Sequence, residues 1–64
     1  MELLRRATVE AKTGLSRSTL YAAMAAGRFP KPVKLGENSV AWIADEVEAW
    51  IKARVSERDE AAAA

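Results

Sequence analysis

A short run of hydrogen-bonding side chains beginning at Arg17 holds most of the chemistry that this sequence offers. Arg17, Ser18, Thr19 and Tyr21 follow the stretch Gly14-Leu15-Ser16 and lead into a row of alanines. The planar guanidinium group of an arginine can donate two hydrogen bonds to O6 and N7 of guanine, and hydroxyl groups can bond bases or phosphates. We therefore predict that these four side chains read base edges, with Arg17 as the main reader and Ser18 as the first choice among the hydroxyls.

Each of these side chains also has an ordinary structural use, which the sequence leaves open. Arg17 can be a solvated surface arginine, and Thr19 can bond back into its own helix. Tyr21 can equally be a half-buried core residue. Ser16 is of a type that caps helices, and it is also a candidate phosphate contact.

The charge is distributed unevenly along the 64 residues, although the formal net charge is only +1. Residues 1–36 carry seven Lys or Arg against two Glu, and residues 37–64 carry three against seven Asp or Glu. A basic half suits a polyanionic partner, while an ordinary solvated surface explains charge alone about as well. We expect Arg28, Lys31 and Lys34 to neutralise phosphates, which sets affinity rather than sequence preference. Arg5 and Arg6 either join that surface or keep the N-terminus solvated.

The residue inventory argues against several classes of protein. The sequence has no His and no Cys, which removes imidazole catalysis, thiol nucleophiles, the usual zinc ligand sets and disulfides. So short a chain also lacks the scaffold for a walled substrate pocket. We expect no enzyme activity, no metal and no cofactor. Because no signal-peptide core and no membrane-spanning apolar run is visible, we expect a cytoplasmic protein with no membrane partner.

The basic half is predicted to contain two helices joined by a tight turn. Thr8 can cap a helix over about 8–13, and Gly14 is suited to end it in the left-handed conformation. Ser16 then caps a second helix over 17–26, which Gly27 ends and whose apolar stripe is Leu20, Ala23 and Met24. A connection this short forces the helices to cross steeply, as in a helix-turn-helix. Before them, Leu3-Leu4 is either an edge strand or an irregular start.

The remainder is predicted to be a hairpin followed by a third helix. Residues 33–35 and 40–42 alternate around Gly36-Glu37-Asn38-Ser39, which favours two strands and a turn. Asn38 and Ser39 at the tip of this wing can reach the minor groove or phosphates, or they are simply turn residues.

Asp45 and Glu48 resemble a capping box for the third helix, expected over about 46–57 and packed under the hairpin. Its apolar stripe is Val47, Trp50, Ile51 and Val55, and both Trp42 and Trp50 are assigned to the core. We expect one domain over 1–58 and a tail over 59–64 that extends the helix or frays, with fraying near Ala64.

Four blocks of this sequence together resemble the AlpA family of phage and prophage regulatory proteins. The blocks are Thr13-Gly14-Leu15-Ser16-Arg17-Ser18-Thr19-Leu20-Tyr21, Gly27-Arg28-Phe29-Pro30-Lys31-Pro32-Val33-Lys34-Leu35-Gly36, Val40-Ala41-Trp42 and Val47-Glu48-Ala49-Trp50-Ile51. The resemblance implies a mainly α fold with a small β-hairpin, a winged helix-turn-helix of the MerR and excisionase type. It also implies a sequence-specific transcriptional regulator or an excisionase, that is, a recombination directionality factor. Double-stranded DNA is then the expected partner, with the second helix in the major groove.

Two features indicate that a single copy binds DNA only modestly. The second helix has alanines at 22, 25 and 26, where similar proteins often carry long polar side chains, and Glu37 makes the hairpin tip acidic. A second copy of the chain, by dimerisation or cooperative assembly on DNA, and an integrase or the transcription machinery are therefore expected as further partners. The alternative function is a protein-interaction module of the same fold that docks through the acidic third helix, where Glu46 and Glu48 lie.

Overall fold

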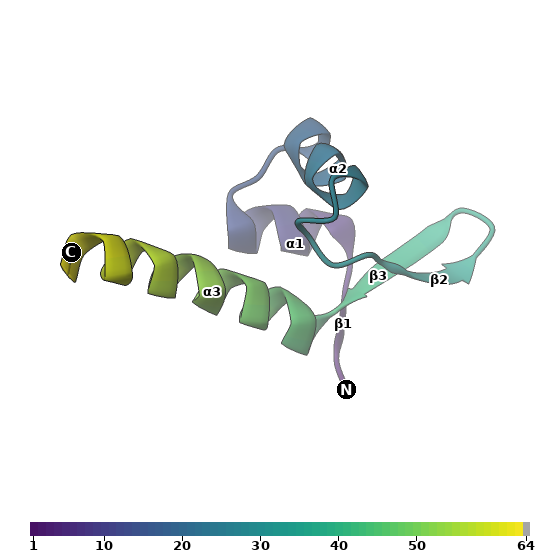
Figure 1. Cartoon of the computed structure of the whole chain (residues 1–64). Coiled ribbons are helices and arrows are strands. Elements are labelled where there is room, and N and C mark those ends of the chain that lie inside the picture. The colour runs from purple at the N-terminus through teal and green to yellow at the C-terminus, as the bar shows by residue number, and fades with distance from the viewer. Residues whose placement is uncertain (64) are drawn as a thin grey trace.

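Three helices and a small antiparallel sheet make up the chain in the computed structural model, which describes residues 1–63 (Figure 1). This arrangement confirms the expected fold class, a mainly α winged helix-turn-helix with a β-hairpin. None of the helices within the described part is both long and apolar enough to cross a membrane. The elements in chain order are β1 (Leu3–Leu4), α1 (Arg6–Thr13), α2 (Arg17–Ala25), β2 (Val33–Gly36), β3 (Ser39–Ile43) and α3 (Ala44–Ala63).

The turn between α1 and α2 is built from Gly14 and the side chain of Thr13. Gly14 has φ 74°, in the left-handed region where a Cβ is penalised, and its amide donates to the carbonyl of Glu10 at 2.8 Å. The hydroxyl of Thr13 donates to the carbonyl of Val9 at 2.8 Å and accepts from the amide of Leu15 at 3.3 Å. The predicted end of α1 at Gly14 is confirmed, and these bonds hold the two helices in a fixed relation.

Ser16 begins α2 in the expected way. Its hydroxyl oxygen accepts from the amide of Thr19 at 3.2 Å, which satisfies one of the free amides of the first helical turn. At the other end Ala26 closes the helix and Gly27 follows with φ 76°. Leu20 is fully buried, and Ala23 and Met24 pack against the core beside it, so the predicted apolar stripe of this helix is confirmed.

The start of α1 differs from the prediction. The helix begins at Arg6 with Arg5 as its N-cap residue, so Thr8 lies inside the helix and caps nothing. No side chain forms a cap bond there. The reason is tertiary, because Leu3 and Leu4 pair with β3 as an edge strand and the chain turns straight into the helix. Arg6 instead forms an ion pair with Glu10, at 3.0 Å and one helical turn away.

The sheet has the strand order β1-β3-β2, so the hairpin is extended by the two residues at the N-terminus. Leu4 lies opposite Trp42 in β3, and Val33 in β2 lies opposite Ala41. The register shifts by one residue between Lys34 and Gly36, which lets Gly36 pair with Ser39 around the turn. The predicted hairpin is confirmed.

The core lies where the sheet meets the three helices. Its largest fully buried side chains are Trp42, Leu20, Val9 and Val47. The indole nitrogen of Trp42 donates to the carbonyl of Pro30 at 3.0 Å, so this buried donor is satisfied. The prediction that Trp42 is a core residue is confirmed.

The third helix differs from the prediction at both ends. It begins at Ala44, directly after β3, and the amide of Ala44 donates to the carbonyl of Glu2 at 2.9 Å. Asp45 is therefore a residue of the first turn, and the predicted capping box is wrong, because the helix begins before Asp45 and the carboxylate of Glu48 accepts from Lys12 at 3.1 Å. The helix continues to Ala63, past the expected end near residue 57. Fraying of the tail stays a prediction, and Ala64 lies outside the described residues.

The third helix also does not lie under the hairpin. In Figure 1 the hairpin and α3 leave the body on opposite sides, with α1 and α2 between them. Val47 is fully buried and Ile51 packs against the core, but Val55 remains 42% exposed. Trp50 is partly buried, with its ring edge-to-face against Phe29 at 5.0 Å between centroids. The apolar stripe therefore serves the core only over the first two turns of the helix.

Candidate nucleic-acid interface

The face of α2 that points away from the core is made of short side chains. Ser18, Ala22 and Ala25 are exposed, and Leu20 and Met24 hold the opposite face against the core. Because no long side chain projects from this face, a partner can approach the backbone of α2 closely there. Ser18 lies in the first turn of that face, and its role as a base reader stays a prediction.

A cationic hollow of about 450 Å³ lies beside this face, between the start of α1, α2 and the hairpin. Its polar lining side chains are those of Arg5, Arg6, Arg17, Tyr21 and Asn38. The guanidinium carbon of Arg17 lies 5.9 Å from the centroid of the Tyr21 ring, one helical turn further on, which orients both side chains along the surface. Two predicted base readers and one predicted wing residue are thus brought together with the arginine pair at positions 5 and 6.

The short strand β1 is what brings that arginine pair into the hollow. Because Leu3 and Leu4 are tied to β3, the next two residues are held beside the hairpin and close to α2. Arg5 and Arg6 are both exposed, and Arg6 shares its charge with Glu10. The sequence alone left these two arginines outside the predicted site. The signal that could have placed them was the Leu3-Leu4 pair read as an edge strand.

A second, shallower depression continues the surface on the other side of Tyr21. It is lined by Met24, Ala25, Lys31 and Pro32 next to the tyrosine, whose side chain is 39% exposed. Tyr21 is therefore a surface ring at the junction of two depressions rather than a core residue. Lys31 lies beside it, and its predicted contact with phosphate stays a prediction.

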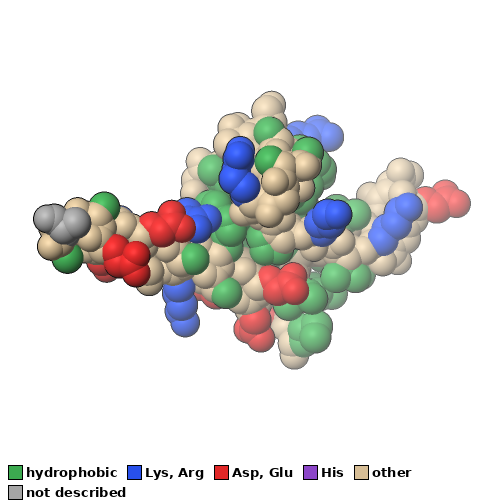
Figure 2. All heavy atoms as spheres, in the orientation of Figure 1, with side chains coloured by type: hydrophobic (Ala, Val, Ile, Leu, Met, Phe, Trp, Pro, Cys, Tyr) green, Lys and Arg blue, Asp and Glu red, His purple; other side chains and the backbone are tan. Residues whose placement is uncertain are grey.

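The hairpin supplies the outer end of this surface. Lys34 is exposed on β2, and Glu37 and Asn38 form the turn. Ser39 is partly buried and pairs with Gly36, which fits the alternative that it is simply a turn residue. In Figure 2 Lys and Arg side chains lie over α2, along the hairpin and on α3, whereas Asp and Glu lie on α3 and at the hairpin tip.

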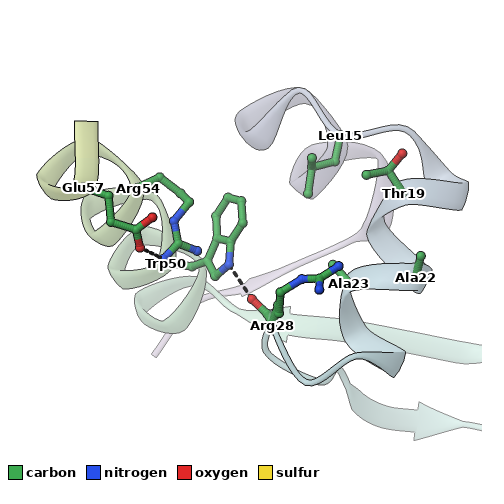
Figure 3. Close-up of a pocket in the computed structure, with 8 residues that line it drawn as sticks. All are labelled: Leu15, Thr19, Ala22, Ala23, Arg28, Trp50, Arg54 and Glu57. Atoms are coloured by element: carbon green, nitrogen blue, oxygen red, sulfur yellow. Dashed lines mark hydrogen bonds and ion pairs between the residues drawn. The ribbon is translucent and has the colours of Figure 1, made fainter. Parts of the chain in front are cut away.

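Three predicted site residues, Ser16, Thr19 and Arg28, belong neither to the cationic hollow nor to the surface that continues it. Thr19 and Arg28 line a groove between α2 and α3, whose other lining residues include Trp50 and Arg54 (Figure 3). The hydroxyl of Ser16 caps α2 and also donates to the hydroxyl of Thr19 at 2.9 Å. Both hydroxyls are thus already engaged with each other, while Arg28 forms no ion pair with any of the described residues 1–63.

The chemistry of the surface is hydrogen bonding and charge neutralisation. Residues 1–63 contain no buried polar or charged side chain and no group of three side chains suited to bind a metal ion. The arginines and lysines of the surface are all exposed. An arrangement of exposed cations around a helix with short side chains fits an extended polyanion better than a small molecule enclosed in a pocket.

Comparison with known proteins agrees with this geometry. The family model described as "Prophage CP4-57 regulatory protein (AlpA)" matches residues 2–55. The chain is 35% identical over 60 residues to the "DNA-binding transcriptional activator AlpA" of Escherichia coli (strain K12), with 84% of this chain and 86% of that protein covered. It is 49% identical over 45 residues to the "Uncharacterized protein ORF88" of Enterobacteria phage P4, with 70% of this chain covered. The chain spans about half the length of that phage protein, 51%.

Proposed function

We propose that this chain, which belongs to the family of the prophage CP4-57 regulatory protein AlpA, binds double-stranded DNA as a sequence-specific regulator. Helix α2 would enter the major groove with its first turn toward the base edges, and α1 would cross the backbone. The observation that carries the proposal is the cationic hollow, in which three arginines from α2 and the N-terminal segment meet Tyr21 and the wing residue Asn38.

The roles of the side chains follow from where they lie around α2. Arg17 is assigned to a guanine, a contact worth roughly 1–3 kcal/mol of discrimination against other bases. Ser18, on the outward face of the first turn, is assigned to a base or its adjacent phosphate. Arg5, Arg6, Lys31 and Lys34 flank α2 and are assigned to backbone phosphates, which position the helix without reading sequence. Asn38 is assigned to the backbone or the minor groove beside the wing.

Control of transcription is the process that we favour. The Escherichia coli relative, which aligns over 86% of its own length, is named as a DNA-binding transcriptional activator. Excision of a prophage, in which a directionality factor assists an integrase, is the runner-up. Both need the same DNA surface, so the two are separated by whether loss of the protein changes transcript levels or recombination products.

The test is selection of bound duplexes from a random-sequence library by the purified chain, followed by binding titrations on the selected duplex. Arg17→Ala should lose roughly tenfold to a hundredfold in affinity for that duplex and relax preference at one base pair. Lys52→Ala, which removes an exposed cation from α3, is the matched control and should leave both unchanged. A library that shows no enriched sequence would refute sequence-specific binding.

A second candidate function is a protein-interaction module that uses α3. Asp45 and Glu46 are exposed in its first turn, and neither forms an ion pair within residues 1–63. Under this alternative, charge reversal at Glu46 and Glu48 would abolish cellular activity, while the double change Arg17→Ala and Ser18→Ala would leave it intact. The opposite pattern is expected if DNA binding is the function.

A further inference from the structure

The groove between α2 and α3 is lined by none of the side chains that the proposed function assigns to DNA. It has a volume of about 600 Å³ and mostly apolar walls, formed in part by Leu15, Ala23 and Trp50 (Figure 3). Arg28 lines it from the end of α2, and Arg54 and Glu57 line it from α3. These three charged side chains sum to one positive charge, which a single incoming carboxylate would neutralise.

The groove is held open by contacts between its own walls. The indole nitrogen of Trp50 donates to the carbonyl oxygen of Arg28 at 2.6 Å, which fixes the segment after α2 against α3. Arg54 lies with its guanidinium carbon 5.0 Å from the centroid of the same indole and is paired with Glu57. The side chain of Arg28 forms no ion pair with any of residues 1–63. It is therefore the cation of the groove that still lacks a carboxylate.

The hairpin tip carries a carboxylate and an aliphatic side chain that are also without partners in the described chain. Glu37 is exposed in the turn and has no cation within ion-pair distance among residues 1–63. Leu35, two residues earlier, is 50% exposed. A carboxylate beside the proposed DNA surface repels phosphate unless another group neutralises it. The tip therefore matches the groove in charge and in apolar character.

We propose that the hairpin tip of one copy binds in the α2–α3 groove of a second copy, with Glu37 against Arg28 and Leu35 over the apolar wall. The inference rests on the proposed function, because DNA holds the two copies side by side at high effective concentration. Since the hairpin and α3 leave the body on opposite sides of α2, the contact joins unlike surfaces (Figure 1). Such a head-to-tail contact can repeat along DNA and makes the binding of neighbouring copies cooperative.

A DNA phosphate is the competing occupant of the groove. Arg28 and Arg54 could neutralise one, but the apolar walls would then remain exposed beside it. A protein segment with an aliphatic side chain covers those walls as well as pairing the charge. A second copy therefore accounts for both the charge and the apolar walls of the groove, whereas a phosphate accounts for the charge alone.

The test is cooperative binding to duplexes that carry two copies of the selected site, with spacings scanned around one helical turn, about 10 base pairs. At the best spacing the second copy should bind about fivefold or more tighter than the first. Glu37→Arg and Arg28→Glu should each abolish this factor, and the double variant should regain it because the ion pair is restored in reverse. The factor is a ratio to single-site affinity, so a change in phosphate contacts cancels.

Three results would overturn the inference while leaving the proposed function intact. The first is tight single-site binding with no cooperativity at any spacing. The second is cooperativity that neither charge reversal alters. The third is loss in both single variants without recovery in the double variant. If Arg28→Glu weakens single-site binding and leaves the cooperativity factor unchanged, the groove holds a phosphate instead.

Cross-linking gives a readout that does not depend on affinity for DNA. The chain contains no cysteine, so single cysteines can be introduced at chosen positions. An equimolar mixture of Asn38→Cys and Glu57→Cys chains should form mixed dimers with a short bis-maleimide at high protein concentration. Asn38→Cys mixed with Lys52→Cys is the control, because Lys52 is an exposed residue of α3 that does not line the groove. Equal yields in the two mixtures would contradict the contact.

Discussion

The salt dependence of DNA binding should report how many cations surround α2, and Arg5→Ala is the most informative perturbation of it. Four exposed cations are assigned to phosphates: Arg5, Arg6, Lys31 and Lys34. About four phosphates are therefore neutralised per copy. With a slope near −0.9 per phosphate, the logarithm of the affinity should fall with the logarithm of salt at about −3.6.

The assay is fluorescence anisotropy with a labelled duplex of the selected sequence between 50 and 200 mM salt. Over that fourfold range the parent chain should lose roughly 150-fold in affinity. Removal of one phosphate contact by Arg5→Ala should reduce the slope to about −2.7 and the loss to roughly 40-fold. The sequence preference should stay the same, because a phosphate contact reads no base.

The matched control is Lys52→Ala, which removes an exposed cation of α3 and should leave the slope at its parent value. Equal slopes for Arg5→Ala and the parent chain would refute the placement of the N-terminal arginines at the DNA. A slope that falls equally with Lys52→Ala would refute the whole assignment of faces, because α3 would then contact the DNA as well.

Three further predictions concern the fold that carries this surface, and all can be measured by urea unfolding followed by tryptophan fluorescence. Leu20→Ala, at a fully buried position, should lower the free energy of unfolding by about 2–5 kcal/mol, and a loss below 1 kcal/mol would contradict its place in the core. Gly14→Ala should cost about 1 kcal/mol because its φ is 74°, whereas Gly36→Ala, which also meets open space but has no positive φ, should cost less; equal effects would exclude a backbone origin. Ser16→Ala removes the acceptor for the amide of Thr19 and should cost about 1 kcal/mol, a loss that Ser16→Asp should largely avoid.

The helix-turn-helix could be predicted because its signals are local. Gly14 and Ser16 act through their own backbone conformation and through hydrogen bonds within one turn, so their types are readable without tertiary context. The apolar stripe of α2 could likewise be predicted from the spacing of its residues. The start of α1 was not, because Thr8 has the right type for a cap but the pairing of β1 with β3 fixes where the chain enters the helix.

Errors at α3 have the same origin. Asp45 and Glu48 have the types and spacing of a capping box, yet the backbone carbonyl of Glu2 accepts from the amide of Ala44 and the helix begins two residues before the predicted start. The continuation to Ala63 follows from helix propensity with few tertiary contacts, and propensity alone does not set an end point.

The candidate site also has a part that could be predicted from the sequence and a part that depends on tertiary structure. Sequence alone determined that Arg17, Ser18 and Tyr21 share the first turns of one helix, because residues on a helix keep a fixed angular relation. Only the tertiary structure decided that Arg5, Arg6 and Asn38 join Arg17 in one hollow while Arg28 and Thr19 face α3. These residues lie on separate elements, and their distances depend on how the sheet and the helices pack around Trp42 and Leu20. Residue types and their spacing determine the chemistry within one helix, whereas the packing of the core determines which side chains from distant parts of the sequence come into contact.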